Sequence, residues 1–179
     1  MPRIIIGSFD VQFEGRTITF TSSEDSARII NHIVHDMTTH DSLKKIPAET
    51  LIDFLSYPED LAAGESIVDS EGAVFQAMNE AVDDIARYAE IISPRGLSLD
   101  EAIAWQEHGI IPQVFNMRAT YRIAIIIFTT GKNVTLSRLQ EISDALPENA
   151  QCNSWGHILD DSLGSRIKVT VLANIFRYT

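Results

Sequence analysis

One stretch of the sequence, residues 119–129, restricts the possible folds more than any other. It reads ATYRIAIIIFT, an almost continuous run of apolar and β-branched residues. A strand with one face in water alternates apolar and polar residues, whereas an unbroken apolar run is typical of a central strand buried on both faces. The chain is therefore predicted to build a β-sheet around this strand, with helices packed against the sheet.

Two further strands and two helices are predicted beside this central strand. The strands, Ala150–Leu159 and Arg166–Phe176, flank an Asp/Gly/Ser turn and are expected to form a closing hairpin. Wide apolar stripes at helical spacing predict helices over Ser66–Ile92 and Thr135–Leu146. The predicted fold class is α/β, a two-layer sandwich in which these helices cover the sheet.

The N-terminal part is predicted to add a β-hairpin and a helix. Two β-rich runs, Arg3–Phe13 and Arg16–Thr21, are joined by a tight turn at Glu14-Gly15. Apolar residues at helical spacing then predict a helix over Ser23–Thr38.

The residues between these two parts fit more than one kind of secondary structure. Residues 50–63 read TLIDFLSYPEDLAA, which fits a short helix as well as a buried strand, and Pro58 ends either element. Loop-like residues at the end of this stretch predict a boundary that divides the chain into a segment 1–63 and an α/β domain 64–179.

Composition excludes several classes of partner. The formal charge is −11 and no cluster of Lys and Arg offsets it, so binding to nucleic acids or to acidic membrane surfaces is not expected. The longest apolar run is too short to span a bilayer. One cysteine, Cys152, fits a reducing compartment, and a cytoplasmic location is predicted.

Several segments together resemble the C-terminal domain of FtsZ, in the tubulin/FtsZ superfamily. They are the strand pair Ala150–Phe176, the long helical stretch Gly72–Gly96 and the segment Gly131–Leu146, with a fainter echo in residues 50–61. Roughly the last 110 residues take part in the resemblance. It implies an FtsZ-like central helix and C-terminal α/β domain, in a family known for binding GTP and polymerising.

The nucleotide-binding features of that family are missing from the sequence. FtsZ holds GTP with a glycine-rich loop, because glycine lets backbone N–H groups approach the phosphates. None of the nine glycines in this chain lies within two residues of another, and the first 63 residues are too few for such a domain. GTPase activity is not expected, no cofactor is predicted, and the chain is predicted not to be an enzyme.

The catalytic loop that follows the central helix in FtsZ has a degenerate counterpart here. By the resemblance, Asp100 takes the place of the first acid, Ser98 replaces an asparagine, and Ile103 stands where the second acid would be. A helix that begins at Ser98, with a capping box to Glu101, explains the same residues without any catalytic role.

Two other groups of residues are candidate sites. His32, Asp36 and His40 follow one another at a spacing of four, which on an unbroken helix forms a stripe that a metal ion could use; the alternative is a solvated polar face. The aromatic and sulfur-containing side chains that would serve a protein interface, although each also suits a core, are Trp105, Phe115, Met117 and Trp155.

The sequence therefore predicts a non-catalytic, FtsZ-like protein-interaction module. It would bind or modulate an FtsZ-type polymer, bind another protein, or associate with itself. The alternative is a small-molecule-binding or enzymatic α/β domain whose site lies at an oligomer interface. The polar residues available for such a site are Arg118, Arg122, Glu141 and Arg166.

Overall fold

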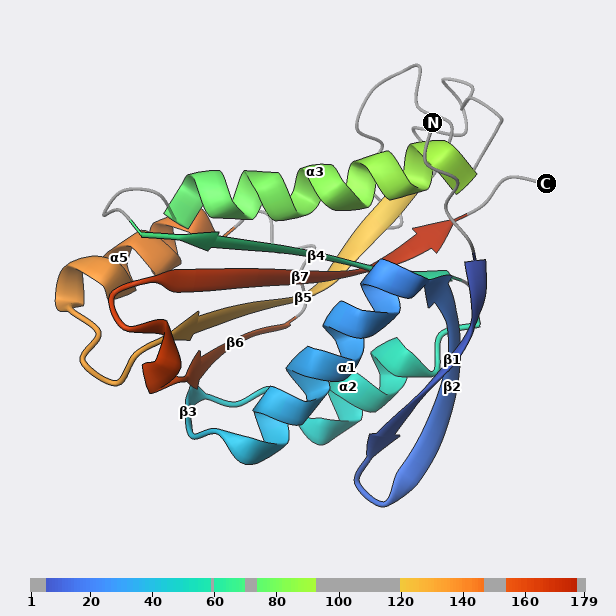
Figure 1. Cartoon of the computed structure of the whole chain (residues 1–179), viewed down its shortest axis with the longest axis horizontal. Coiled ribbons are helices and arrows are strands. Elements are labelled where there is room, and N and C mark those ends of the chain that lie inside the picture. The colour runs from blue at the N-terminus through green and yellow to red at the C-terminus, as the bar shows by residue number, and fades with distance from the viewer. Residues whose placement is uncertain (1–5, 59, 70–73, 93–119, 147–153, 177–179) are drawn as a thin grey trace.

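A computed structural model gives the structure of the chain, and it describes residues 6–58, 60–69, 74–92, 120–146 and 154–176. One mixed seven-stranded sheet runs through these residues in the order β1-β2-β4-β7-β5-β6-β3. Figure 1 shows α3 and α5 against one face of the sheet and α1 and α2 against the other. The predicted α/β class is confirmed, and the N-terminal segment adds a helical layer of its own.

The elements have the following bounds in chain order. The strands and helices are β1 (Ile6–Phe13), β2 (Arg16–Ser23), α1 (Glu24–Thr39), β3 (Ser42–Lys44), α2 (Ala48–Leu55), β4 (Asp60–Val68), α3 (Val74–Ile92), β5 (Thr120–Thr130), α5 (Leu136–Ala145), β6 (Ser154–Leu159), a short 3-10 turn (Asp161–Leu163) and β7 (Ile167–Phe176).

The N-terminal hairpin forms as predicted. Strands β1 and β2 pair antiparallel over their full lengths, from Ile6 opposite Ser23 to Phe13 opposite Arg16. The two turn residues, Glu14 and Gly15, have φ values of 53° and 71°, the left-handed conformation that a two-residue hairpin turn requires. The helix that follows begins where expected, because the Ser23 side chain accepts a hydrogen bond from the N–H of Ser26.

The expected closing hairpin is wrong. Strands β6 and β7 do not pair with each other, because β5 lies between them, parallel to β6 and antiparallel to β7. Strand β5 contains the long apolar run, and a central position gives it neighbours on both edges and cover on both faces. Helix α5 provides the crossover that a parallel β5–β6 pair needs.

The boundaries around the long helix also differ from the prediction. Helix α3 begins at Val74 rather than at Ser66, because residues 60–68 form β4 and pair along their whole length with β7. The predicted boundary at Ala63-Gly64 lies in the middle of this strand. The ambiguous stretch before it contains both alternatives, helix α2 and then β4.

Each face of the sheet has its own apolar core. The odd-numbered residues of β7, such as Val169 and Val171, belong to the cluster beneath α3 and α5, whereas Leu172 faces the cluster beneath α1 and α2. Strand β7 is buried on both faces. In the described part of the chain, no helix is both long and apolar enough to cross a membrane.

Candidate functional site

A polar cavity of about 340 Å³ lies on the face of the sheet that α1 and α2 cover. Helix α2 and the residue after its cap form one wall, with Asp53 and Tyr57 on the cavity side. The sheet forms the other wall, where β5 contributes Arg122, β6 Ser154 and β7 Asn174. A volume of this size is at the lower end of the range for small-molecule sites.

Two neighbouring side chains in the cavity have buried donors without an acceptor. Arg122 and Asn174 are directly opposite each other in the β5–β7 ladder, so their side chains project from the same face of the sheet. The Nε of Arg122 and the Nδ2 of Asn174 are buried and have no hydrogen-bond partner in the described structure. Asn174 is only 1% exposed. Buried donors of this kind are rare in folded proteins and are a reason to look for a missing acceptor.

A β-bulge shapes the sheet wall next to these donors. The β5–β7 register shifts between Ile123 and Ile125, which leaves Ala124 as an extra residue on β5. Ala124 and Ile125 consequently both line the cavity, where strict alternation would have directed one of them to the opposite face. Bulges of this kind occur often beside binding and active sites, because they change the direction of the neighbouring side chains.

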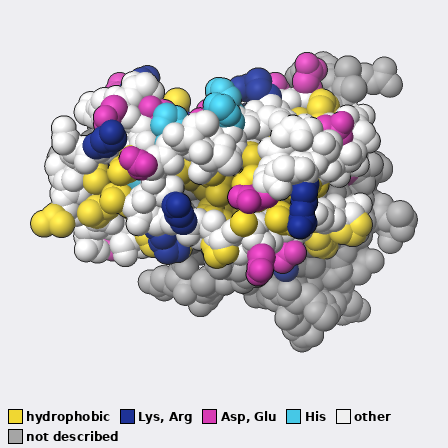
Figure 2. All heavy atoms as spheres, turned by 90° about the horizontal axis from the view of Figure 1, so that it is seen from below, with side chains coloured by type: hydrophobic (Ala, Val, Ile, Leu, Met, Phe, Trp, Pro, Cys, Tyr) yellow, Lys and Arg dark blue, Asp and Glu magenta, His cyan; other side chains and the backbone are white. Residues whose placement is uncertain are grey.

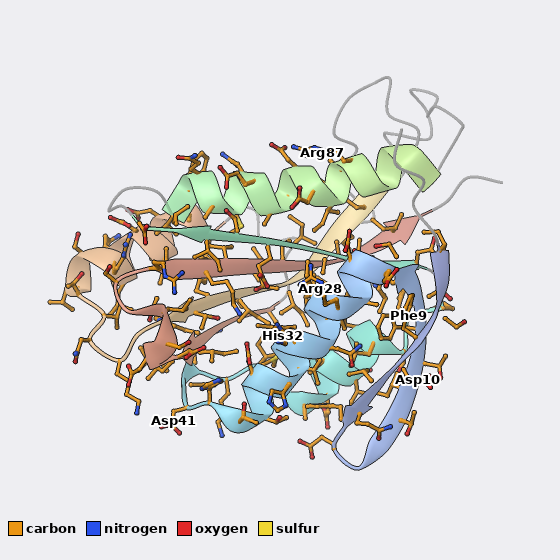
Figure 3. All side chains as sticks on the ribbon, in the orientation of Figure 1. Phe9, Asp10, Arg28, His32, Asp41 and Arg87 are labelled. Atoms are coloured by element: carbon orange, nitrogen blue, oxygen red, sulfur yellow. The ribbon has the colours of Figure 1, made fainter. Side chains whose placement is uncertain are left out.

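The outer edge of β1 is a second candidate site, of a different kind. Strand β1 is terminal in the sheet order, and over the described residues no strand lies on its outer side. Figure 3 shows Phe9 and Asp10 on this strand, at the margin of the molecule. The strand has eight residues, with no proline, no lysine and no shift in register, and Asp10 is its one charged residue, so most of the usual protections of an exposed edge are absent from it.

The histidine and aspartate residues predicted as a weak metal site lie in an ion-pair cluster. Asp36 is 3.3 Å from the Nζ of Lys168 and 3.8 Å from the Nε2 of His40. The same His40 nitrogen is 3.9 Å from Asp160. His32, which Figure 3 labels on α1, is exposed and one turn before Asp36. A lysine ammonium thus contacts the carboxylate that would have bound a metal ion.

The described residues contain no group of three His, Cys, Asp or Glu side chains spaced to hold a metal ion. The electrostatics of the cluster instead favour the ionised form of Asp160. A hydrogen bond from the Ser162 hydroxyl is the main reason that the pKa of Asp160 is lowered, and His40 and Lys168 lower it further. Figure 2, which views the molecule from below, shows the histidine side chains close together on the surface, with acidic and basic side chains interspersed.

Of the predicted interface residues, only Trp155 belongs to the described part. It is half-buried on β6, with the Lys44 ammonium 4.2 Å from its ring centroid and Phe128 packed edge-on at 6.3 Å. These contacts describe a packed side chain at the margin of a core. The other three candidates, Trp105, Phe115 and Met117, lie outside the described residues, as do Ser98 and Asp100 of the degenerate catalytic loop.

Of the four polar residues considered for an oligomer-interface site, three are described, and each has its own surroundings. Arg122 lines the cavity near the end of β7. Arg166, just before the start of that strand, donates to the carbonyl of Leu163, and Glu141 pairs with Arg138 on α5 at 3.1 Å. Arg118 lies outside the described residues.

Sequence reasoning missed the most unusual residues of the cavity, Asn174 and Asp53. A signal for Asn174 was present, since it is an amide within the otherwise apolar stretch VLANIF of a predicted strand. No comparable signal existed for Asp53, because an acidic residue on a short helix is ordinary. Its place opposite Arg122 depends on how α2 packs over the sheet.

Comparisons with known proteins add a likeness of fold and no family. No family model matches the chain, and no curated protein matches it. Among solved structures, the chain is similar to "FtsZ W319Y mutant, P1" of M. jannaschii, with 15% identity over 83% of this chain and 37% of that one, and a TM-score of 0.48. It is also similar to "FtsZ dimer, empty" of the same organism, with 12% identity over 83% and 38% and a TM-score of 0.44. The chain thus spans less than two fifths of the length of either protein.

Proposed function

We propose that this chain is a non-catalytic interaction module that binds another polypeptide by adding a strand to the outer edge of β1. The observation that carries the proposal is the outer edge of β1, beside which no other strand of the described residues lies. A two-residue turn fixes the alternation of the β1–β2 ladder, which directs the backbone groups of Ser8, Asp10 and Gln12 to the outer side. A strand that pairs there would satisfy these groups, which is the mode called β-augmentation.

The side chains of β1 favour a partner that contributes backbone rather than a large apolar surface. Phe9, Val11 and Phe13 turn inward to the core, while the intervening side chains are exposed and polar. Two of these are held by cross-strand hydrogen bonds, from Gln12 to Thr17 at 2.8 Å and from Thr19 to Asp10 at 2.6 Å. These pairs link β1 to β2 through side chains and leave the outer backbone groups of β1 available.

The partner we propose first is a second copy of the chain. Two β1 edges can pair antiparallel around a twofold axis, and each copy then satisfies the outer backbone groups of the other. The net charge of −11 opposes this association at low ionic strength. At 0.1 M salt, repulsion between charges more than about 10 Å apart is largely screened, so dimerisation should strengthen as salt is added.

Sedimentation equilibrium over a range of protein and salt concentrations tests this function. The variant Ser8→Pro removes one outward N–H without touching the β1–β2 bonds, and Ser8→Ala is the control that keeps it. We expect a concentration-dependent dimer for the wild type and for Ser8→Ala, and at least a tenfold weaker one for Ser8→Pro. If the chain stays monomeric at all concentrations, the proposed self-association is wrong. If Ser8→Pro dimerises as strongly as the wild type, the edge of β1 is not the interface.

A narrower version has an FtsZ-type polymer as the partner, and its support is the sequence resemblance of roughly the last 110 residues. A module of this kind would cap or modulate a filament rather than extend it. Adding the purified chain to an FtsZ assembly reaction should change the polymer mass, or the chain should co-sediment with the polymer. If an excess of the chain does neither, that version fails and strand addition with other partners is unaffected.

A further inference from the structure

The polar cavity beneath α2 supports an inference that is independent of strand addition at β1. Its sheet wall presents two donors side by side, the guanidinium of Arg122 and the amide of Asn174. The Asn174 side chain is almost fully buried, and its Nδ2 has no acceptor in the described structure. Leaving a buried donor unpaired costs about 1–3 kcal/mol, so a fold that keeps two of them in one cavity has positioned them for an acceptor that binds there.

The two donors are held on two adjacent inner strands of the sheet. Strands β5 and β7 are the central pair of the sheet, with neighbours on both sides. The bulge at Ala124 lies two residues from Arg122 and supplies the apolar floor with Ile125. Preorganised donors on rigid strands, above an apolar floor, are typical of a small-molecule site, and a planar acceptor is the geometry that a guanidinium matches best.

The opposite wall carries the complementary charge. Asp53 projects from α2 into the same cavity and is exposed at its rim. No ion pair joins Asp53 to Arg122, or either residue to any other group, in the described structure. One cation on the sheet wall and one anion on the helix wall give a lining with no net charge, and the cavity separates the two.

The charges in the cavity favour a carboxylate over a phosphate as the bound anion. A phosphate would bring two negative charges next to Asp53, in a protein whose net charge is already −11. A carboxylate needs one cation and one or two hydrogen-bond donors, which Arg122 and Asn174 supply. The carboxylate of Asp53 then remains for an ammonium group on the same ligand.

We propose that this cavity binds a small zwitterionic carboxylate of the amino-acid class. The carboxylate of the ligand accepts hydrogen bonds from Arg122 and Asn174, and its ammonium group lies toward Asp53 at the rim. No bond is made or broken in this proposal, which assigns a binding site and not a reaction.

Titration calorimetry with four probes tests the ligand class. Glycine carries both charged groups, acetate only the carboxylate, methylamine only the cation, and inorganic phosphate the competing anion. We expect saturable binding of glycine, binding of acetate at least tenfold weaker, and no detectable binding of methylamine. Larger L-amino acids then map the size limit of the cavity. If phosphate binds more tightly than glycine, or if neither glycine nor the larger amino acids bind, the proposal is wrong.

Three variants assign the contacts. Arg122→Met keeps the length of the side chain and should abolish binding of glycine and of acetate, whereas Arg28→Met, at an exposed position on α1 labelled in Figure 3, should change neither. Asp53→Asn should weaken the binding of glycine at least tenfold, and it should leave the binding of acetate unchanged or make it stronger. If Asp53→Asn loses affinity for glycine and for acetate equally, the proposed orientation of the ligand is wrong. If Arg122→Met binds glycine with wild-type affinity, the proposed site is wrong.

The variant Asn174→Leu keeps the test independent of folding defects. It replaces the unpaired amide by an apolar side chain of the same branched shape that can extend into the cavity, so the protein should unfold at the same or a higher temperature while its affinity for glycine falls at least tenfold. A destabilised Asn174→Leu that still binds glycine normally would mean that the amide serves the fold and not a ligand.

Discussion

The two faces of the central sheet are built on different principles. Beneath α3 and α5, the buried residues of β7 are the apolar series Ile167, Val169, Val171, Ala173 and Ile175. On the other face, the same strand presents Lys168, Thr170, Leu172 and Asn174 to α1 and α2, all of them buried. This strand thus contributes only apolar side chains to the core beneath α3 and α5, called the dry core below, and mostly polar side chains to the core beneath α1 and α2.

The distribution of unpaired polar atoms follows this division. The buried side-chain atoms without a hydrogen-bond partner, within the described part, belong to four residues of the α1/α2 face: Arg122, Thr129, Thr170 and Asn174. By contrast, close packing characterises the α3 side, where the backbone of Gly64 faces the backbone of Ala81. Stability is expected to come mainly from the α3/α5 face, while the α1/α2 face gives up part of it to keep polar groups in place.

The largest effect should come from Gly64 on the dry face. A Cβ added there would lie 1.9 Å from the carbonyl oxygen of Ala81, so the Gly64→Ala variant must push α3 away from β4. We expect a loss of about 3 kcal/mol or more in the free energy of unfolding, measured by urea denaturation. Gly7→Ala is the control, because its Cβ would meet only the Phe9 ring at 3.6 Å and should change stability little. Equal effects in the two variants would show that α3 is not tightly packed.

A smaller effect is expected at the ion pair on the polar face. Asp36 and Lys168 are 14% and 10% exposed and 3.3 Å apart. Asp36→Asn leaves a buried ammonium without its closest counter-charge and should reduce the free energy of unfolding by about 2 kcal/mol. The double variant Asp36→Asn, Lys168→Met should be more stable than the Asp36→Asn variant alone, because it also removes the orphaned charge. Strictly additive losses would mean that the two side chains do not interact in solution.

Adjacent residues of β7 allow a direct test of the two faces. Val169→Thr places a hydroxyl in the dry core and should destabilise the protein by about 1–3 kcal/mol. Thr170→Val removes a hydroxyl that has no partner, and should be neutral or stabilising. Thermal denaturation of the two variants, which exchange the same pair of residue types, measures the difference between the faces. A cost for Thr170→Val similar to that for Val169→Thr would contradict the comparison.

The smallest predicted effect concerns His157, a polar residue on the α3/α5 side. Its Nε2 lies 2.7 Å from the Thr130 hydroxyl, and burial lowers its pKa below the ordinary 6.5. The unfolded chain therefore binds a proton that the folded chain excludes, so stability should fall as the pH drops below 6.5, by at most about 1.4 kcal/mol per pH unit.

Urea denaturation at pH 7.5 and pH 5.5 measures this slope. The His157→Gln variant should have a smaller slope than the wild type. The lowered pKa of Asp160 acts in the same direction but only below 3.8, outside this window. An unchanged slope in His157→Gln would contradict His157 as the source of the pH dependence.

Much of the fold followed from local pattern. The continuous apolar run predicted a central strand, and β5 is in the middle of the sheet because only there are both faces and both edges covered. The Glu14-Gly15 turn and the cap at Ser23 located the hairpin and α1 to within a few residues. By contrast, β4 was mistaken in part for the start of α3, because its nine residues, DLAAGESIV, show neither a strict alternation nor a clear helical period.

The sequence by itself determined which segments are apolar on one side or on both, and hence the α/β class and most of the strands and helices. Only the tertiary structure decided that β6 and β7 are separated by β5, since strand order depends on pairings between residues far apart in the chain. It also placed Arg122 beside Asn174 and Asp53 opposite them. These residues come from three elements, and their juxtaposition depends on register and helix packing, which no local pattern encodes.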